Sequence, residues 1–211
     1  MFGIQHFSLF LVSSILLNIT PGQDTMYILG RSIAQGKKAG TISVFGIMTG
    51  VLVHTLLAAF GLSVILATSS LAFSIVKYLG AGYLLWIGFG FLLKGQNNQH
   101  VEVDKKAPVK SWTIYRQGIL TNVLNPKVSL FFLSFLPQFV VPQADVVFVP
   151  FFMLGMTFFT TGSIWCMVLV LGSTWLKDKI GHRTAVGGIA KKLTGALFVG
   201  LGVKLAFSSA D

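Results

Sequence analysis

The residues with the clearest chemical potential are a carboxylate and an amine that each follow a proline inside an apolar stretch. Asp24 stands three residues after Pro21, and Lys127 directly follows Pro126. Asp24 is also the only acidic residue within a stretch long enough to cross a bilayer. A charge near mid-membrane costs about 2.5–3.5 kcal/mol on insertion scales, so a charged side chain beside a broken helix predicts a functional site.

The segment around Pro21 combines a helix breaker with polar side chains. Pro21 removes one backbone donor and clashes with the preceding turn, and Gly22 has no side chain to hold a regular helix. We therefore expect free carbonyl groups near Asn18 and a short helix that restarts around Gln23. Asp24 would lie in the first turn of this helix, where its carboxylate could hold a cation or carry a proton.

The second segment, residues 122–127, gives two interpretations of the charged pair. An ammonium group near Asp24 and a carboxylate near Lys127, or near the amides exposed after Pro126, would suit a zwitterion such as a free amino acid. Alternatively, Asp24 and Lys127 neutralise each other across the molecule, and the pair could then act as a gate. The candidate binding residues of both segments are Asn18, Pro21, Gly22, Gln23, Asp24, Asn122, Asn125, Pro126 and Lys127.

His54 is a further candidate because it lies at the centre of another apolar stretch. An imidazole changes charge near neutral pH, so His54 could relay protons. The alternative, which we favour, is a core histidine bonded to a neighbouring carbonyl.

The sequence contains no pattern typical of a metal site or a cofactor site. Cys166 is the only cysteine, which excludes an intrachain disulfide and a cysteine cluster. His6, His54, His100 and His182 are scattered without metal-ligand spacing, and no nucleotide-binding motif is present. We expect no cofactor, no metal and no direct coupling to ATP.

Six apolar stretches must position these residues. The 211-residue chain is 54% hydrophobic and only 10% charged, against about one quarter charged in soluble domains. Each stretch has about 20 residues or more, enough to cross the bilayer as a helix. We predict an all-α integral membrane protein with a single domain, 1–211, and a first helix that is retained because no cleavage site follows it. The predicted spans are Phe7 to Leu29, Thr41 to Ala67, Phe73 to Leu93, Gln117 to Val141, Val146 to Trp175 and Gly188 to Phe207.

The basic residues behind the net charge of +10 are distributed as membrane topology predicts, and they do not indicate nucleic-acid binding. Of the 16 Lys and Arg residues, three lie between spans one and two, five lie between spans three and four, and five lie between the end of span five and the first turn of span six. By the positive-inside rule these loops are cytoplasmic and both termini are periplasmic. Anionic lipid headgroups are the expected neighbours of the basic loops.

The two halves of the chain resemble each other. Pro21 and Pro126 are 105 residues apart, and small-residue patterns recur late in each half. Three helices in each half is an odd number, so the second copy would enter the membrane from the opposite side, as in the inverted repeats of secondary transporters. We predict repeats at about 1–95 and 115–211, joined by a cytoplasmic linker at about 96–114. The recurring patterns are Gly80-Ala81 with Gly195-Ala196, and Gly88/Gly90 with Gly200/Gly202.

Three motifs follow one another along the chain: Thr20-Pro21-Gly22-Gln23-Asp24-Thr25 with Gly30-Arg31-Ser32 and Gly36-Lys37-Lys38-Ala39-Gly40, then residues 78–88, then Asn122–Lys127 with residues 135–139. In these motifs the chain resembles the lysine-exporter superfamily, in particular its RhtB-type branch of threonine, homoserine and homoserine-lactone efflux proteins. The resemblance covers nearly the whole chain. It implies export of amino acids or their derivatives across the bacterial inner membrane, driven by exchange for protons. The family usually has a second proline after the glycine, where this chain has Gln23.

Two other functions stay open from the sequence. Some relatives in the wider superfamily export metal ions, although a lone membrane carboxylate and the absence of a cysteine pair argue against that cargo. An intramembrane enzyme could use Asp24 and Lys127 or His54 as acid and base, but no nucleophile or cofactor motif accompanies them. Gly46 and Gly50 form a GxxxG pair, which serves either internal packing or a homo-oligomer.

Overall fold

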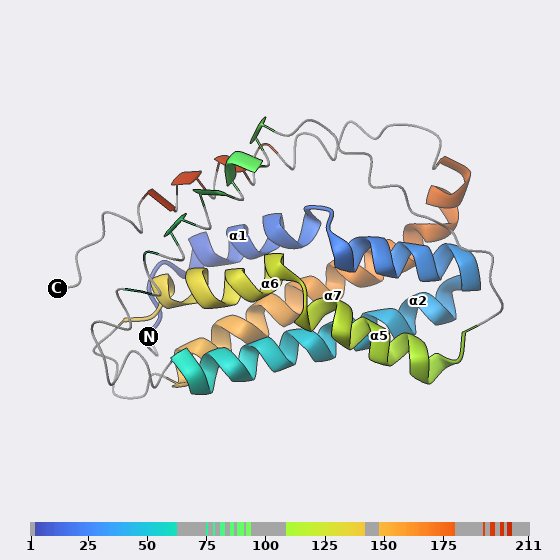
Figure 1. Cartoon of the computed structure of the whole chain (residues 1–211), viewed down its shortest axis with the longest axis horizontal. Helices are drawn as coiled ribbons and strands as arrows, with labels where there is room; N and C mark the ends of the chain where they lie inside the picture. Colours follow the sequence, from blue (N-terminus) through green and yellow to red (C-terminus); the bar gives the residue numbers. More distant parts are fainter. Residues whose placement is uncertain are drawn as a thin grey trace.

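A computed structural model of the chain describes residues 3–62, 109–141 and 148–179, with isolated helical residues between 75 and 93 and between 192 and 203. Apart from one isolated β-bridge, every element in these ranges is helical (Figure 1). Most of the predicted third and sixth spans, and most of the predicted linker, lie outside the described residues.

The first predicted span is broken where the sequence indicates. α1 covers Phe7–Ile19, and α2 begins at Gln23 with Asp24 in its first turn. The intervening Gly22 is fully extended, with φ −159° and ψ −168°. Proline blocks the continuation of α1 because it has no backbone donor, so the carbonyl groups at the end of α1 are left for other partners. The predicted restart of the helix at Gln23 is confirmed.

α2, Gln23–Leu57, is a helical hairpin, so the residues predicted to form a loop between spans one and two are helical on both sides of a turn at Gly36. Only Gly36 departs from helical geometry there, with φ 83°, a conformation that glycine adopts without steric cost. A methyl group on Gly40 would overlap the side chain of Ser32. In a straight helix these residues would be about 12 Å apart along the axis, so the chain reverses at Gly36. The π-helical turn η1, Ala58–Leu62, ends the second arm.

The second broken span also consists of two helices separated at a proline, but here a side chain caps the restarted helix. α5, Ser111–Val123, and the segment Pro126–Phe139 meet at 46°. Asn125 caps the restarted helix, since its side chain accepts a hydrogen bond from Lys127 N at 3.0 Å. α5 begins at Ser111 and not at the predicted Gln117. After the break follow α6, Pro126–Leu130, the π-helical η2, Phe131–Phe135, and the 3₁₀-helical η3, Leu136–Phe139.

Small residues let the second arm of α2 pack closely on α5. A methyl group on Gly118 would lie 3.1 Å from Gly46 Cα, and one on Gly50 would lie 2.7 Å from Asn122 Cβ. Close approach of this kind is what small residues provide at helix interfaces in membranes. The GxxxG pair of the sequence therefore serves packing within the chain.

In the described part, two helical segments are long and apolar enough to cross a membrane: Gln23–Leu62, which includes the reversal at Gly36, and Phe148–Ser173. There are three such spans if the bent pair of α5 and Pro126–Phe139 counts as one. The segment Phe148–Ser173 belongs to α7, Phe148–Lys179, which crosses the other helices in Figure 1. Large apolar side chains are exposed on both long helices, among them Phe45, Phe60, Ile164 and Leu171. An all-α, multi-pass membrane protein accounts for these features.

Candidate functional site

The two helix breaks lie next to each other in the fold. Both lie near the middle of its long axis in Figure 1. Lys127 Nζ donates a hydrogen bond to the carbonyl oxygen of Thr20 at 2.7 Å, so the amine of one break occupies an acceptor released by the other. A methyl group on Gly22 would lie 3.5 Å from Lys127 Nζ and Cδ, so the lysine side chain runs in van der Waals contact over this residue.

Asp24 is held by one of its two oxygens only. Asn122 Nδ2 donates to Asp24 Oδ2 at 2.8 Å, while Asp24 Oδ1 is buried without a hydrogen-bond partner. Asn122 is fully buried, and its backbone carbonyl oxygen lies 3.2 Å from His54 Nε2. Asn122 therefore joins the carboxylate on one side to the imidazole on the other. His54 is buried and makes the contact with a carbonyl group that a core histidine would make.

Asp24 and Lys127, both within the described residues, form no ion pair with each other. The carboxylate takes its hydrogen bond from Asn122, and the ammonium group gives its hydrogen bond to Thr20. Both side chains nevertheless line one small cavity. The carboxylate of Asp24 and the ammonium group of Lys127 thus face the same cavity, and they are not bonded to each other. Asp24 Oδ1 can still accept a hydrogen bond.

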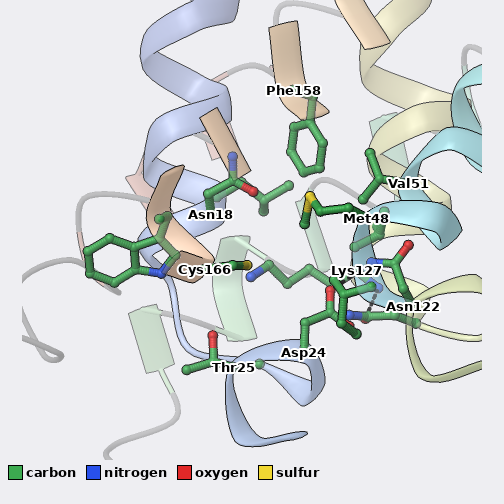
Figure 2. Close-up of a pocket in the computed structure, with 15 residues that line it drawn as sticks. Asn18, Asp24, Thr25, Met48, Val51, Asn122, Lys127, Phe158 and Cys166 are labelled. Atoms are coloured by element: carbon green, nitrogen blue, oxygen red, sulfur yellow. Dashed lines mark hydrogen bonds between the residues drawn. The ribbon is translucent and has the colours of Figure 1, made fainter. Parts of the chain in front are cut away.

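The cavity has a volume of about 30 Å³, enough for about two water molecules and far below the roughly 300 Å³ of an open ligand pocket. It lies between α1, the two breaks, the second arm of α2 and α7 (Figure 2). Polar side chains line one part of the wall and apolar side chains the other. The lining residues are Asn18, Gly22, Asp24, Thr25, Asn122, Asn125, Lys127, Trp165 and Cys166, together with Leu17, Ile47, Met48, Val51, Val128 and Phe158.

The structure brings six of the sequence-predicted candidates to this cavity and leaves four off it. Gln23 and Pro126 are exposed, Pro21 shapes the break without lining the cavity, and His54 reaches it only through Asn122. The six that line the cavity are Asn18, Gly22, Asp24, Asn122, Asn125 and Lys127.

Sequence reasoning missed the cavity residues that come from unbroken helices. Met48 and Val51 belong to the second arm of α2, and Trp165 and Cys166 belong to α7. Cys166 is a buried free thiol, and it lies in the cavity wall. The one signal that could have identified Trp165 is its polar N–H within an otherwise apolar span, because buried tryptophan usually has a hydrogen-bond partner.

Different contacts close the two ends of the cavity region. On the side of the Gly36 reversal, Tyr27 OH donates to the Ile114 carbonyl oxygen and Arg31 donates to Gln117 Oε1, each at 2.7 Å. On the opposite side, Phe158 in the cavity wall packs on other phenylalanines, which continue as far as the N-terminal residues, where Gln5 N donates to the Phe139 carbonyl oxygen at 2.9 Å. The ring centroids of this cluster lie 4.7 to 6.2 Å apart, and its members are Phe10, Phe131, Phe132, Phe135, Phe139 and Phe158.

Within the described residues, no group of three or more His, Cys, Asp and Glu side chains comes together as a metal site would require. The cavity itself offers Asp24 and Cys166 from these residue types. Its donor set of amides, one ammonium and one carboxylate fits an organic zwitterion better than a metal ion.

Known proteins are similar to this chain over nearly their whole length. The family model of LysE type translocators matches residues 15–209. The chain belongs to this family. It is 30% identical over 205 residues to a leucine efflux protein of Klebsiella pneumoniae, covering 97% of this chain and 96% of that protein.

Two further relatives of this LysE-type translocator are similar over comparable lengths. A leucine efflux protein of Salmonella typhimurium is 29% identical over 97% of this chain and 96% of its own length. The membrane protein YrhP of Bacillus subtilis is 29% identical over 92% of this chain and 94% of its own length. No solved structure matches the chain. Membership of a translocator family makes this protein a transporter and not an enzyme.

Proposed function

We propose that this LysE-type translocator exports a free amino acid with an aliphatic side chain from the bacterial cytoplasm, in exchange for protons. The observation that carries the proposal is the pair of opposite charges, Asp24 and Lys127, on one cavity without a direct ion pair between them. The relatives named leucine efflux proteins support an amino acid as the substrate.

The cavity has the chemistry of a zwitterion site. The free oxygen of Asp24 can accept from the substrate ammonium, and Lys127 can exchange its bond to the Thr20 carbonyl for one to the substrate carboxylate. Met48, Val51 and Phe158 supply an apolar wall for an aliphatic side chain. The present volume is too small for an amino acid, so the structure corresponds to a compact state that must open to load substrate.

Proton coupling follows from competition for one carboxylate. An ammonium group binds ionised Asp24, and a proton on the same carboxylate removes that interaction. On the more acidic outer side a proton therefore displaces the substrate, and on the inner side the substrate displaces the proton. Because substrate and proton compete for the same carboxylate, the one acidic residue that lines the cavity can couple export to proton entry.

Helix contacts support a six-helix inverted repeat in the single domain. A methyl group on Gly88 would lie 2.9 Å from the Gly195 carbonyl oxygen and 2.7 Å from Val199, and one on Gly202 would lie 3.0 Å from the Ala81 carbonyl oxygen and 2.9 Å from Leu85. As the numbers rise on one segment they fall on the other, so the two segments run antiparallel. An offset of 114 relates Ala81 to Gly195, Leu85 to Val199 and Gly88 to Gly202. Equivalent contacts made by antiparallel helices are expected from two inverted halves.

We predict that both termini face the periplasm and that Lys105 faces the cytoplasm. The physical reason is that 13 basic residues lie on alternate loops, which the positive-inside rule assigns to the cytoplasm. Reporter fusions at the C-terminus and an impermeant thiol reagent applied to a Lys105→Cys variant of Cys166→Ser would measure both positions. A cytoplasmic C-terminus would remove the odd number of helices on which the inversion rests.

Counterflow in proteoliposomes tests the transport function itself. Vesicles loaded with unlabelled L-leucine should accumulate labelled L-leucine, and a pH gradient alone should drive net leucine movement against the direction of proton flow. Vesicles without protein provide the blank, and Trp112→Phe, at an exposed position of α5, provides the matched control. Counterflow that requires a divalent metal, with none for leucine or other amino acids, would favour the metal-exporter alternative.

A further inference from the structure

Three of the four buried polar side-chain atoms that lack a partner in the described residues belong to residues that line one cavity. They are Asp24 Oδ1, Asn122 Oδ1 and Trp165 Nε1, and the fourth is Ser14 Oγ. Native proteins satisfy nearly all buried polar groups, because an unpaired group loses its hydration without compensation. Their concentration at one site indicates that something outside the chain completes their bonding.

The chemical types of these atoms divide the cavity into an accepting and a donating part. The two free oxygens are acceptors, and the Asn122–Asp24 hydrogen bond of 2.8 Å holds their side chains together. The indole N–H of Trp165 can only donate. Trp165 precedes Cys166 on α7, and the Lys127 amine points toward Cys166 in Figure 2. Trp165, Cys166 and Lys127 all line the cavity, so both donors come from its wall.

We propose that the Trp165 indole N–H binds the substrate carboxylate together with Lys127, and that Asn122 Oδ1 binds the substrate ammonium together with Asp24. This assignment rests on the proposed function and specifies its substrate class. Tight binding requires an α-amino acid that has both its free carboxylate and its free ammonium group. Amines, esters and lactones that lack the carboxylate leave the Trp165 and Lys127 donors without an acceptor.

The apolar wall then receives the substrate side chain. Met48, Val51 and Phe158 line the cavity beside the charged residues. Methionine is unbranched and can adopt several conformations, so Met48 can move aside as the cavity enlarges from its volume of about 30 Å³. A branched aliphatic side chain such as that of leucine matches this lining.

Trp165→Phe tests the donor because it removes the N–H and keeps an aromatic ring. The probes are L-leucine and 3-methylbutylamine, which is leucine without its carboxylate, and the readouts are ligand-induced stabilisation in detergent and competition in leucine counterflow. We expect the variant to bind L-leucine about tenfold more weakly and 3-methylbutylamine within about twofold of the wild type. Trp112→Phe, the same change at an exposed position, should alter neither affinity.

The outcomes separate this inference from the proposed function. If the wild type neither binds nor exchanges L-leucine, the proposed function fails for this substrate and the inference fails with it. If the wild type binds L-leucine and Trp165→Phe binds it equally well, or loses affinity for both probes to the same extent, only the role of Trp165 is overturned.

A second variant decides the matter should Trp165→Phe not fold. In Lys127→Met the indole N–H is the remaining proposed donor for a carboxylate. This variant should still bind L-leucine several-fold more tightly than 3-methylbutylamine. Equal binding of the two probes would show that Trp165 contributes nothing to carboxylate recognition.

Discussion

An Asp24→Asn variant is expected to fold with the stability of the wild type and to lose leucine transport by about 100-fold or more. The amide is nearly isosteric, and its oxygen can still accept the 2.8 Å hydrogen bond from Asn122. It cannot ionise, so the site loses both its partner for the substrate ammonium and its group for proton exchange. A hydrogen bond to a charged group contributes about 1.5–3 kcal/mol, which corresponds to a tenfold to 100-fold loss of binding before the loss of coupling is added. Counterflow rate and melting temperature in detergent measure the two effects separately.

The same chemical change outside the spans provides the control for Asp24. Asp145→Asn removes a carboxylate from the predicted loop between spans four and five and should leave counterflow within about twofold of the wild type. Wild-type transport by a well-folded Asp24→Asn protein would end the assignment of Asp24 to substrate or proton binding.

The double variant Asp24→Asn, Lys127→Met is expected to stay inactive on L-leucine however stable it is. A structural ion pair would behave differently, because removing one partner of a buried pair costs about 3–5 kcal/mol and removing both relieves much of that cost. Here each charge has its own partner, Asn122 for Asp24 and the Thr20 carbonyl for Lys127. The two side chains share one cavity, so we expect a coupling free energy of about 0.5–3 kcal/mol between the two substitutions, without recovery of leucine transport in the double variant.

Melting temperature and counterflow of both single variants and the double variant complete this thermodynamic cycle. A ligand without a carboxylate, such as a homoserine lactone, should lose less affinity than L-leucine in Lys127→Met. Restoration of leucine transport in the double variant would overturn the substrate clamp and favour mutual neutralisation.

Local chemistry made the two breaks predictable from the sequence. Pro21 and Pro126 each remove a backbone donor, so the end of one helix and the start of the next follow from the residues themselves. The charges of Asp24 and Lys127 are costly in a membrane, which is why they could be assigned to one site before their contacts were known. Their separate hydrogen-bond partners could not be predicted, because these depend on how α2 and α5 pack.

The hairpin in α2 and the apolar wall of the cavity were not predictable for two different reasons. The polar residues around Gly36 have the composition of a loop, yet one glycine with φ 83° suffices to reverse the chain while both flanks stay helical. Met48 and Val51 lie in a span that is apolar on its lipid-facing side and its buried side alike. In such a helix, composition does not distinguish a residue in a cavity wall from one in the core or against lipid.

Cys166 makes the unmodified chain a reporter of its own conformational cycle. It is the only sulfhydryl group in 211 residues, it is buried, and it lies in the wall of the cavity between the two helix breaks. A membrane-impermeant maleimide can therefore react with the native protein at one position only, and in the compact state that position is shielded. Alkylation of wild-type protein consequently counts the molecules whose cavity has opened to water, and the side of the membrane from which the reagent is added tells which face has opened.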